Sequence, residues 1–222
     1  MTYLHIIAPA RSGAEAVRLA ALSDPNWREV HDGAEADPSL DDSAKNLVTY
    51  EPQNCFEISQ IATSDPAAKF LFISRSPIDV VGSSLTAWKS GKFVTHDQLE
   101  GWWGEKWSFQ LLPNWQEQIG KPLPEVAANQ FVETAEAAIA DLSSLSEENW
   151  TGLHFEDFLA DPQDVLAAAL DRLGIDWAGE LGAEVPKSSR ILTPPRRNKW
   201  HRQQGELIPA LNALGTRLKS IN

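Results

Sequence analysis

Residues 69–92 read KFLFISRSPIDVVGSSLTAWKSGK, and this stretch decides the fold. Residues 70–73 form an apolar run rich in aromatic and β-branched side chains, without the polar alternation of a half-exposed strand. Residues 76–79 are typical of a helix start, because the serine can cap, the proline suits the first helical position and the aspartate complements the exposed amides. Apolar residues then recur at helical spacing over 81–88. The stretch therefore predicts a central strand, a tight turn and a helix.

Two side chains in this stretch suit an anion. Arg75 stands at the carboxyl end of the strand, just before a helix amino terminus whose backbone N–H groups favour negative charge. Ser83 lies two turns into the helix, so an arginine fork and a hydroxyl could together grip a phosphate. The alternative is that Arg75 pairs with Asp79 or a neighbour and that Ser83 only packs. A second anion site elsewhere would favour the phosphate.

The amino-terminal residues repeat the same plan. Residues 4–8 predict a buried strand, residues 9–13 (PARSG) a tight turn, and residues 14–22 a helix by propensity. Arg11 and the amides around Ser12 and Gly13 could cradle a second anionic group. The Walker pattern of two glycines with a Gly-Lys-Ser/Thr ending is absent, which disfavours a nucleotide kinase.

Composition narrows the class of protein. The 222 residues are 42% hydrophobic and 23% charged, as expected for one compact globular domain. The net charge of −12 argues against general binding to nucleic acid or to an anionic membrane. Residues 187–202 reverse this charge, since they contain no Asp or Glu and hold Lys187, Arg190, Arg196, Arg197, Lys199 and Arg202.

Cysteine use and hydropathy indicate a cytoplasmic protein. Cys55 is the only cysteine, so neither an internal disulfide nor a cysteine-based metal site can form, and no metal is expected. No run of about 18 apolar residues occurs, and the amino terminus enters a strand without a signal-peptide pattern.

The rest of the chain alternates predicted strands and helices. Further strands are expected at 28–30, 47–51 and 153–155, and helices at 56–63, 125–145, 161–173 and 203–218. This alternation predicts an α/β fold with a parallel sheet covered on both faces and a ligand at the carboxyl edge of the strands.

For three features of the sequence, two interpretations remain open. Residues 93–146 form a Trp-rich subregion that is expected to be helical, whose aromatic side chains serve as core or as an acceptor-binding wall. The carboxylates of Glu156 and Asp157 are either an acid/base pair or a helix cap with a salt bridge to the sheet. His31 is a weak candidate for a catalytic base and otherwise a surface histidine.

Five segments occur in the order found in one enzyme family. ARSGAE, YEPQN, KFLFISRSPIDVVGSS, LHFEDFLADP and RRNKWHR resemble sulfotransferases that use 3′-phosphoadenosine 5′-phosphosulfate (PAPS), most closely the bacterial branch. The resemblance extends in patches over about residues 4–218. It implies a P-loop-like three-layer α/β/α fold with a central parallel sheet of about four to five strands, formed by residues 1–222 as a single domain.

The resemblance also assigns residues to the two ends of PAPS. Arg11, Ser12 and Gly13 correspond to the loop that holds the 5′-phosphosulfate, and Arg75 and Ser83 to the pair on the 3′-phosphate. The basic residues Arg196, Arg197 and Lys199 correspond to the loop that closes over the nucleotide. Phe155 corresponds to a position near the adenine, where a tyrosine is usual.

The chain departs from the family at the reactive end. Ala14 and Glu15 stand where two hydroxyl residues are usual, and Tyr50 and Glu51 stand where a lysine is usual. A carboxylate about 4 Å from a phosphosulfate would cost roughly 1 to 4 kcal/mol, unless Glu15 points away. The catalytic histidine of the cytosolic branch has no counterpart.

The resemblance implies transfer of a sulfuryl group from PAPS to a hydroxyl or amine of a small-molecule or glycan acceptor. We expect Arg11 to stabilise the transferring group and Glu51 to act as the base. The alternative is a catalytically inactive relative that binds the nucleotide or acts as an interaction module. No nucleic-acid or membrane partner is expected, and a homodimer is left open.

Overall fold

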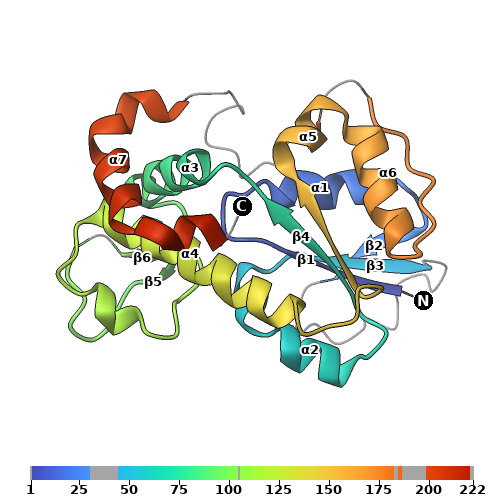
Figure 1. The fold of residues 1–222 in the computed structure, drawn as a ribbon, viewed down its shortest axis with the longest axis horizontal. Helices are drawn as coiled ribbons and strands as arrows, with labels where there is room; N and C mark the ends of the chain where they lie inside the picture. The colour runs from blue at the N-terminus through green and yellow to red at the C-terminus, as the bar shows by residue number, and fades with distance from the viewer. Residues whose placement is uncertain (1, 31–44, 105, 183–184, 187–198, 221–222) are drawn as a thin grey trace.

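A five-stranded parallel sheet forms the centre of the protein in the computed structural model (Figure 1). The structure describes residues 2–30, 45–104, 106–182, 185–186 and 199–220, with the side chains of 199, 219 and 220 left out. The order of the strands is β2-β3-β1-β4-β7. Their bounds are β1 Thr2–Ile7, β2 Trp27–Glu29, β3 Asn46–Thr49, β4 Lys69–Ser74 and β7 Trp150–His154. The prediction of a parallel sheet with the 70–73 segment inside it is confirmed.

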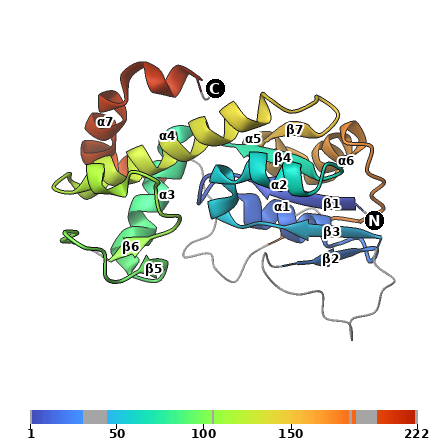
Figure 2. The same ribbon diagram turned by 90° about the horizontal axis from the view of Figure 1, so that it is seen from below.

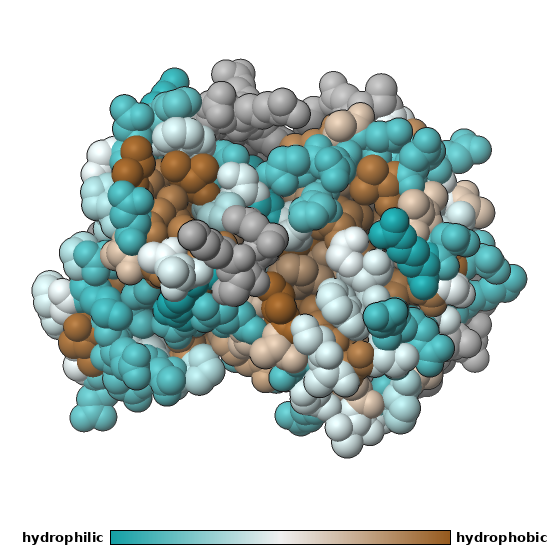
Figure 3. Space-filling model, viewed as in Figure 1, coloured by the Kyte–Doolittle hydropathy of each residue, from teal (hydrophilic) through white to brown (hydrophobic). Residues whose placement is uncertain are grey.

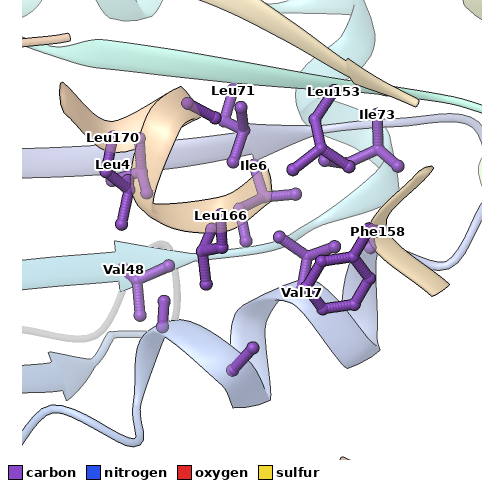
Figure 4. Close-up of a cluster of buried hydrophobic side chains, with 14 of the residues drawn as sticks. Leu4, Ile6, Val17, Val48, Leu71, Ile73, Leu153, Phe158, Leu166 and Leu170 are labelled. Atoms are coloured by element: carbon purple, nitrogen blue, oxygen red, sulfur yellow. The ribbon is translucent and has the colours of Figure 1, made fainter. Parts of the chain in front are cut away.

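Helices cover both faces of the sheet, as the alternating pattern predicts (Figure 2). One face packs against α1 (Ala14–Ala21), α5 (Phe155–Ala160) and α6 (Pro162–Arg172). Figure 4 shows this layer, in which Leu4, Ile6 and Leu71 of the sheet meet Val17 of α1 and Leu166 of α6. The other face packs against the turn η1 (Pro52–Phe56), α2 (Ile58–Ser64) and α4 (Leu123–Leu142). Apolar residues on alternate sides of each strand explain the three layers.

A second group of elements lies beyond the carboxyl ends of the strands (Figure 1). The helix α3 (Pro77–Ser90) packs against α4 and against α7 (Gln204–Ala213) through a separate apolar cluster. The short turns η3 (Lys199–Gln203) and η4 (Gly215–Ser220) flank α7, and the hairpin of β5 (Val94–His96) and β6 (Trp107–Ser108) packs beside α3. These elements surround the edge of the sheet where a ligand is expected.

The predicted helical character of residues 93–146 is wrong for its first half. Described residues between 93 and 122 form the β5–β6 hairpin, loops and the turn η2 (Trp115–Gln118), and only α4 is helical. Gly101 and Gly104 adopt φ values of 77° and 127°, which a helix does not contain. Trp103 and Trp107 therefore do not share a helix face, since Trp107 is buried and Trp103 is 70% exposed.

Two helix predictions need smaller corrections. The predicted helix 203–218 is broken, because Gly215 has a φ of 58° and the chain continues as η4. Ser76 does occupy the position before α3, but its side chain makes no capping hydrogen bond. By contrast, the side chain of Asp161 accepts from the Asp164 amide and caps α6 as the Asp-Pro pair predicts.

Surface hydropathy is mixed on the face shown in Figure 3, where hydrophobic patches alternate with hydrophilic side chains. Within the described part of the chain, no helix is both long enough and apolar enough to span a membrane.

Candidate active site at the ends of β1 and β4

The two central strands deliver their arginines to one place. β1 and β4 are parallel neighbours, and each is followed by a turn and a helix. Arg75 Nη1 donates a hydrogen bond of 3.0 Å to the backbone carbonyl of Arg11. Arg11 Nε in turn donates a hydrogen bond of 3.1 Å to Ser83 Oγ on α3. Three residues predicted to bind anions, from two separate segments, are therefore joined.

The turn after β1 has an unusual backbone. Arg11 has a φ of 71° and Gly13, which precedes α1, has a φ of 101°. A left-handed arginine is strained, and such strain persists only where the surroundings hold it. The bond from Arg75 to the Arg11 carbonyl supplies part of that support, and the Ser12 amide donates back to the Pro9 carbonyl at 3.2 Å.

Phe155 closes one side of this turn. A Cβ atom added to Gly13 would lie 2.3 Å from the Phe155 ring, so only glycine fits at that position. The Arg75 guanidinium carbon lies 5.1 Å from the centroid of the same ring, which is cation–π distance. Phe155 therefore lies with the predicted anion-binding residues, although it packs on the turn itself.

Both arginines are cations held in a largely buried place. Burial lowers the pKa of the Arg11 guanidinium, with Tyr50 acting to raise it and Arg75 to lower it. Burial also lowers the pKa of Arg75, against the opposite influence of Asp79 and Glu156. An arginine remains protonated regardless. Neither side chain forms an ion pair with a carboxylate among the described residues, so the predicted alternative of an Arg75–Asp79 pair is not found.

A buried hydroxyl adds a free donor. Ser12 is 1% exposed, and its Oγ has no hydrogen-bond partner within the described residues. Ser12 and Arg75 together line a small cavity of about 10 Å³, with Pro9 and Ser74 among the other lining residues. A buried hydroxyl without a partner is costly, by about 1 to 3 kcal/mol. Such a group suits a site that an anionic ligand completes.

The residues that depart from the family pattern include Glu15, Tyr50 and Glu51. Glu15 forms an ion pair of 2.8 Å with Arg18 on the same helix. Burial raises the pKa of the Tyr50 hydroxyl far above its ordinary range, so this group can donate a hydrogen bond but cannot serve as a base. Glu51 lies two residues after the end of β3, directly before η1, and is half-buried.

Sequence reasoning missed how the aromatic subregion contacts the site. The Arg11 guanidinium carbon lies 5.1 Å from the centroid of the Phe93 ring. Phe93 stacks on Phe109, with 5.3 Å between ring centroids and 30° between planes. Phe109 has a φ of 66°, which is rare for an aromatic residue, and Thr95 Oγ1 donates to its carbonyl at 2.5 Å. The density of aromatic residues after α3 was the available signal.

A second missed contact supports the turn after β4. Glu156 Oε1 accepts a hydrogen bond of 3.1 Å from the Ser76 amide at the start of α3. The cap interpretation of the Glu156–Asp157 pair is thus the one that the contact favours. Next to this contact, Ser74 Oγ and His154 Nδ1 lie 2.6 Å apart across paired positions of β4 and β7.

Several predicted residues lie outside the described residues. These are His31, Arg196 and Arg197, together with the side chain of Lys199, whose backbone begins η3. The chain that follows is placed next to the site, because Trp200 and Leu207 pack on Gly82, the neighbour of Ser83.

No metal-binding group is formed by the described part of the chain, where no cluster of three or more His, Cys, Asp or Glu occurs. Burial raises the pKa of the Cys55 thiol to about 12, so this thiol stays protonated.

Comparison with known proteins now identifies the class. The model of a family described as "Sulfotransferase family" matches residues 31–179, more than half of the chain. The chain therefore belongs to the sulfotransferase family, as its segments predict. No curated protein sequence matches it.

Solved structures of sulfotransferases share the fold. The sulfotransferase from Alicyclobacillus acidocaldarius is 14% identical, with 96% of this chain and 95% of that chain covered and a TM-score of 0.52. The sulfotransferase domain from the Synechococcus PCC 7002 olefin synthase is 13% identical, with 96% and 94% covered and a TM-score of 0.57. Mouse sulfotransferase SULT7A1, complexed with PAP, is 11% identical, with 97% and 83% covered and a TM-score of 0.60. The predicted sulfotransferase-like α/β/α fold is confirmed.

Proposed function

We propose that this protein transfers the sulfuryl group of PAPS to a hydroxyl or amine of a small-molecule or glycan acceptor. One observation carries the proposal: two partly buried arginines from neighbouring strand ends are joined to each other and to Ser83. Neither arginine has an ion-pair partner among the described residues, and a buried hydroxyl without a partner lies beside them. Guanidinium groups without a carboxylate partner, beside a hydroxyl without a hydrogen-bond partner, suit a ligand with several anionic groups.

The geometry suits a nucleotide that is charged at both ends. Arg11, with Ser12 and Gly13, would hold the 5′-phosphosulfate at the start of α1, where backbone amides also favour an anion. Arg75 and Ser83 would hold the 3′-phosphate at the start of α3. Phe155 would border the nucleotide between them, since its ring already contacts both turns.

The basic segment would supply further charge to the nucleotide. Arg196, Arg197 and Lys199 precede Trp200, which packs on α3 beside Ser83. That anchor point supports their proposed role. The PAP complex of the mouse neighbour adds support for a PAPS-derived ligand.

The proposed reaction is an in-line displacement at sulfur. The acceptor oxygen or nitrogen forms a bond to sulfur while the bond from sulfur to the 5′-phosphate oxygen breaks, and that oxygen keeps the electron pair. Arg11 stabilises the charge that develops on the leaving oxygen. The acceptor proton passes to Glu51, which follows β3 at the same edge of the sheet, and then to solvent.

Calorimetric titration with 3′-phosphoadenosine 5′-phosphate (PAP), the desulfated product, tests the nucleotide site. We expect micromolar binding by the wild-type protein and a loss of at least about 100-fold in Arg75→Ala, because a buried charged donor and the support of Arg11 both disappear. Arg75→Lys is the matched control, since it keeps the charge but cannot reproduce the planar fork. Absence of binding at millimolar PAP would contradict the proposal.

The proposed role of Glu51 as the base is tested by measuring the rate of sulfuryl transfer. With PAPS and an acceptor found by screening, Glu51→Gln is expected to lower kcat by about 100-fold or more while PAP affinity stays unchanged. A variant with normal kcat would remove Glu51 from the mechanism and leave the nucleotide site untouched.

A further inference from the structure

An acidic residue lies where this site can least tolerate one. Glu15 belongs to the first turn of α1, two residues after Gly13, at the helix end whose amides face the proposed phosphosulfate. Its carboxylate is close enough to Tyr50 to affect the hydroxyl, and Tyr50 is also within electrostatic reach of Arg11. A carboxylate free to turn toward the loop would repel an anionic ligand.

Arg18 occupies both oxygens of this carboxylate. Arg18 Nε donates to Glu15 Oε2 at 2.9 Å, and Arg18 Nη2 donates to Glu15 Oε1 at 2.8 Å. This bidentate arrangement fixes the direction of the carboxylate as well as its charge. A residue three positions further along the same helix therefore holds Glu15 on the helix side.

The third nitrogen of the Arg18 guanidinium, Nη1, faces a second carboxylate. Arg18 Nη1 forms an ion pair with Glu29 of β2, so the guanidinium lies between two carboxylates. The Arg18 side chain is only 8% accessible, compared with 29% for Glu15 and 33% for Glu29. The ion pair with Glu29 on the sheet fixes the orientation of the Arg18 guanidinium, and so the direction of its two hydrogen bonds to Glu15.

Stability alone explains this cluster poorly. Burial of the Arg18 guanidinium costs solvation, and an apolar residue of similar size in place of a buried ion-pair partner is often as stable or more so. Arg18 as a whole is only 7% exposed, so its position resembles that of a core residue more than that of a surface charge. The effect that an apolar residue cannot reproduce is the capture of the Glu15 carboxylate.

We propose that Arg18 is a positioning residue that holds Glu15 away from the Arg11–Gly13 turn and so preserves the anion affinity of that turn. The inference rests on the proposed function, because it concerns the same site. It also explains how a chain with glutamate in place of a hydroxyl residue can keep an anion-binding loop.

Four variants titrated with PAP test the proposal. Arg18→Met keeps the bulk of the side chain and removes the bidentate contact that directs Glu15, so PAP affinity is expected to fall about tenfold at low salt and less at high salt. Glu15→Gln alone is expected to bind PAP at least as tightly as the wild type. Glu15→Gln combined with Arg18→Met is expected to restore affinity to within about twofold of Glu15→Gln.

The matched control is Glu29→Gln combined with Arg18→Met, which removes the other carboxylate and should not restore affinity. Urea unfolding of the same variants separates a general loss of stability from the effect on affinity, since rescue by one carboxylate and not by the other is no property of a weakened fold. If Arg18→Met binds PAP like the wild type, or if both double variants recover equally, the inference is wrong.

The outcomes also separate this inference from the proposed function. Binding by Glu15→Gln but not by the wild type would support the nucleotide site and overturn the role of Arg18. Failure of wild type and Glu15→Gln alike to bind PAP would overturn the proposed function, and the role of Arg18 with it.

Discussion

The two strand–turn–helix units of this protein share a plan and differ in how they are held. After β4 the chain needs only Arg75 and Ser76 before the 14-residue helix α3 begins, with no positive φ. After β1 it needs a longer turn with Arg11 and Gly13 at positive φ, and the helix α1 has 8 residues. The turn after β1, here the first turn, is therefore strained, whereas the turn after β4, the second turn, has no residue at positive φ.

Each turn takes its support from another element. The first turn is held by Arg75 on its carbonyl, by Ser83 on its side chain and by the Phe155 ring against its glycine. The second turn is held by the Glu156 carboxylate on the Ser76 amide. The comparison suggests that the turn proposed to face the reacting group is the one whose shape depends on its neighbours.

The largest effect is expected from a side chain at Gly13. Gly13→Ala combines a left-handed φ with a Cβ atom inside the Phe155 ring, so the free energy of unfolding should fall by roughly 3 kcal/mol or more. Urea unfolding measures this loss. Wild-type stability in Gly13→Ala would show that the first turn is not constrained as described.

The corresponding control in the second turn is Ser76→Ala. Because the Ser76 side chain makes no capping bond, its loss should change the free energy of unfolding by no more than about 0.5 kcal/mol. An equal loss in both variants would erase the difference between the two turns. Adding Phe155→Leu to Gly13→Ala should recover part of the loss, since it removes the clash and leaves the strain.

An intermediate effect is expected from Phe93, whose ring lies under the Arg11 guanidinium of the first turn. Phe93→Leu keeps an apolar side chain but removes the ring face under the Arg11 guanidinium, so PAP affinity should fall about threefold to tenfold. Calorimetry with PAP measures the change. Unchanged affinity in Phe93→Leu, with a loss only in Phe93→Ala, would mean that volume matters and the ring face does not.

The smallest effect is expected from the contact that joins the two turns. Ser83→Ala removes the acceptor for Arg11 Nε and one proposed phosphate donor, which should weaken PAP binding about twofold to threefold. Ser84→Ala, one position along α3 and therefore on another face, is the control. Equal affinities of the two variants would remove Ser83 from the site.

Much of the fold follows from local signals in the sequence. Apolar runs such as residues 70–73 and the Asp161–Pro162 helix start have the lengths and flanking residues that local physics requires, and their elements are where they were predicted. The 93–122 region differs because Trp spacing alone suggested a helix. The positive φ values of Gly101 and Gly104 that prevent one depend on tertiary packing.

The candidate site is predictable residue by residue but not in its contacts. Arg11, Arg75 and Ser83 were each identified from strand ends and spacing. The bond from Arg11 to Ser83 spans 72 residues in sequence, and the bond from Arg75 to Arg11 spans 64. The density of aromatic residues after α3 does not say which ring lies under a guanidinium, so Phe93 was missed. For Arg18 a signal existed, since it follows Glu15 by three positions on a predicted helix.

The hydrogen bond from Arg75 to the Arg11 carbonyl has an energetic consequence. A side chain that belongs to one turn and supports the other couples the two turns, so the effects of substitutions in them are not expected to add. In a double-mutant cycle, Arg75→Ala and Ser83→Ala both withdraw support from Arg11, one from its backbone and one from its guanidinium. Under the proposed function, the coupling free energy would make the 3′ end of the nucleotide part of the machinery that orders its 5′ end.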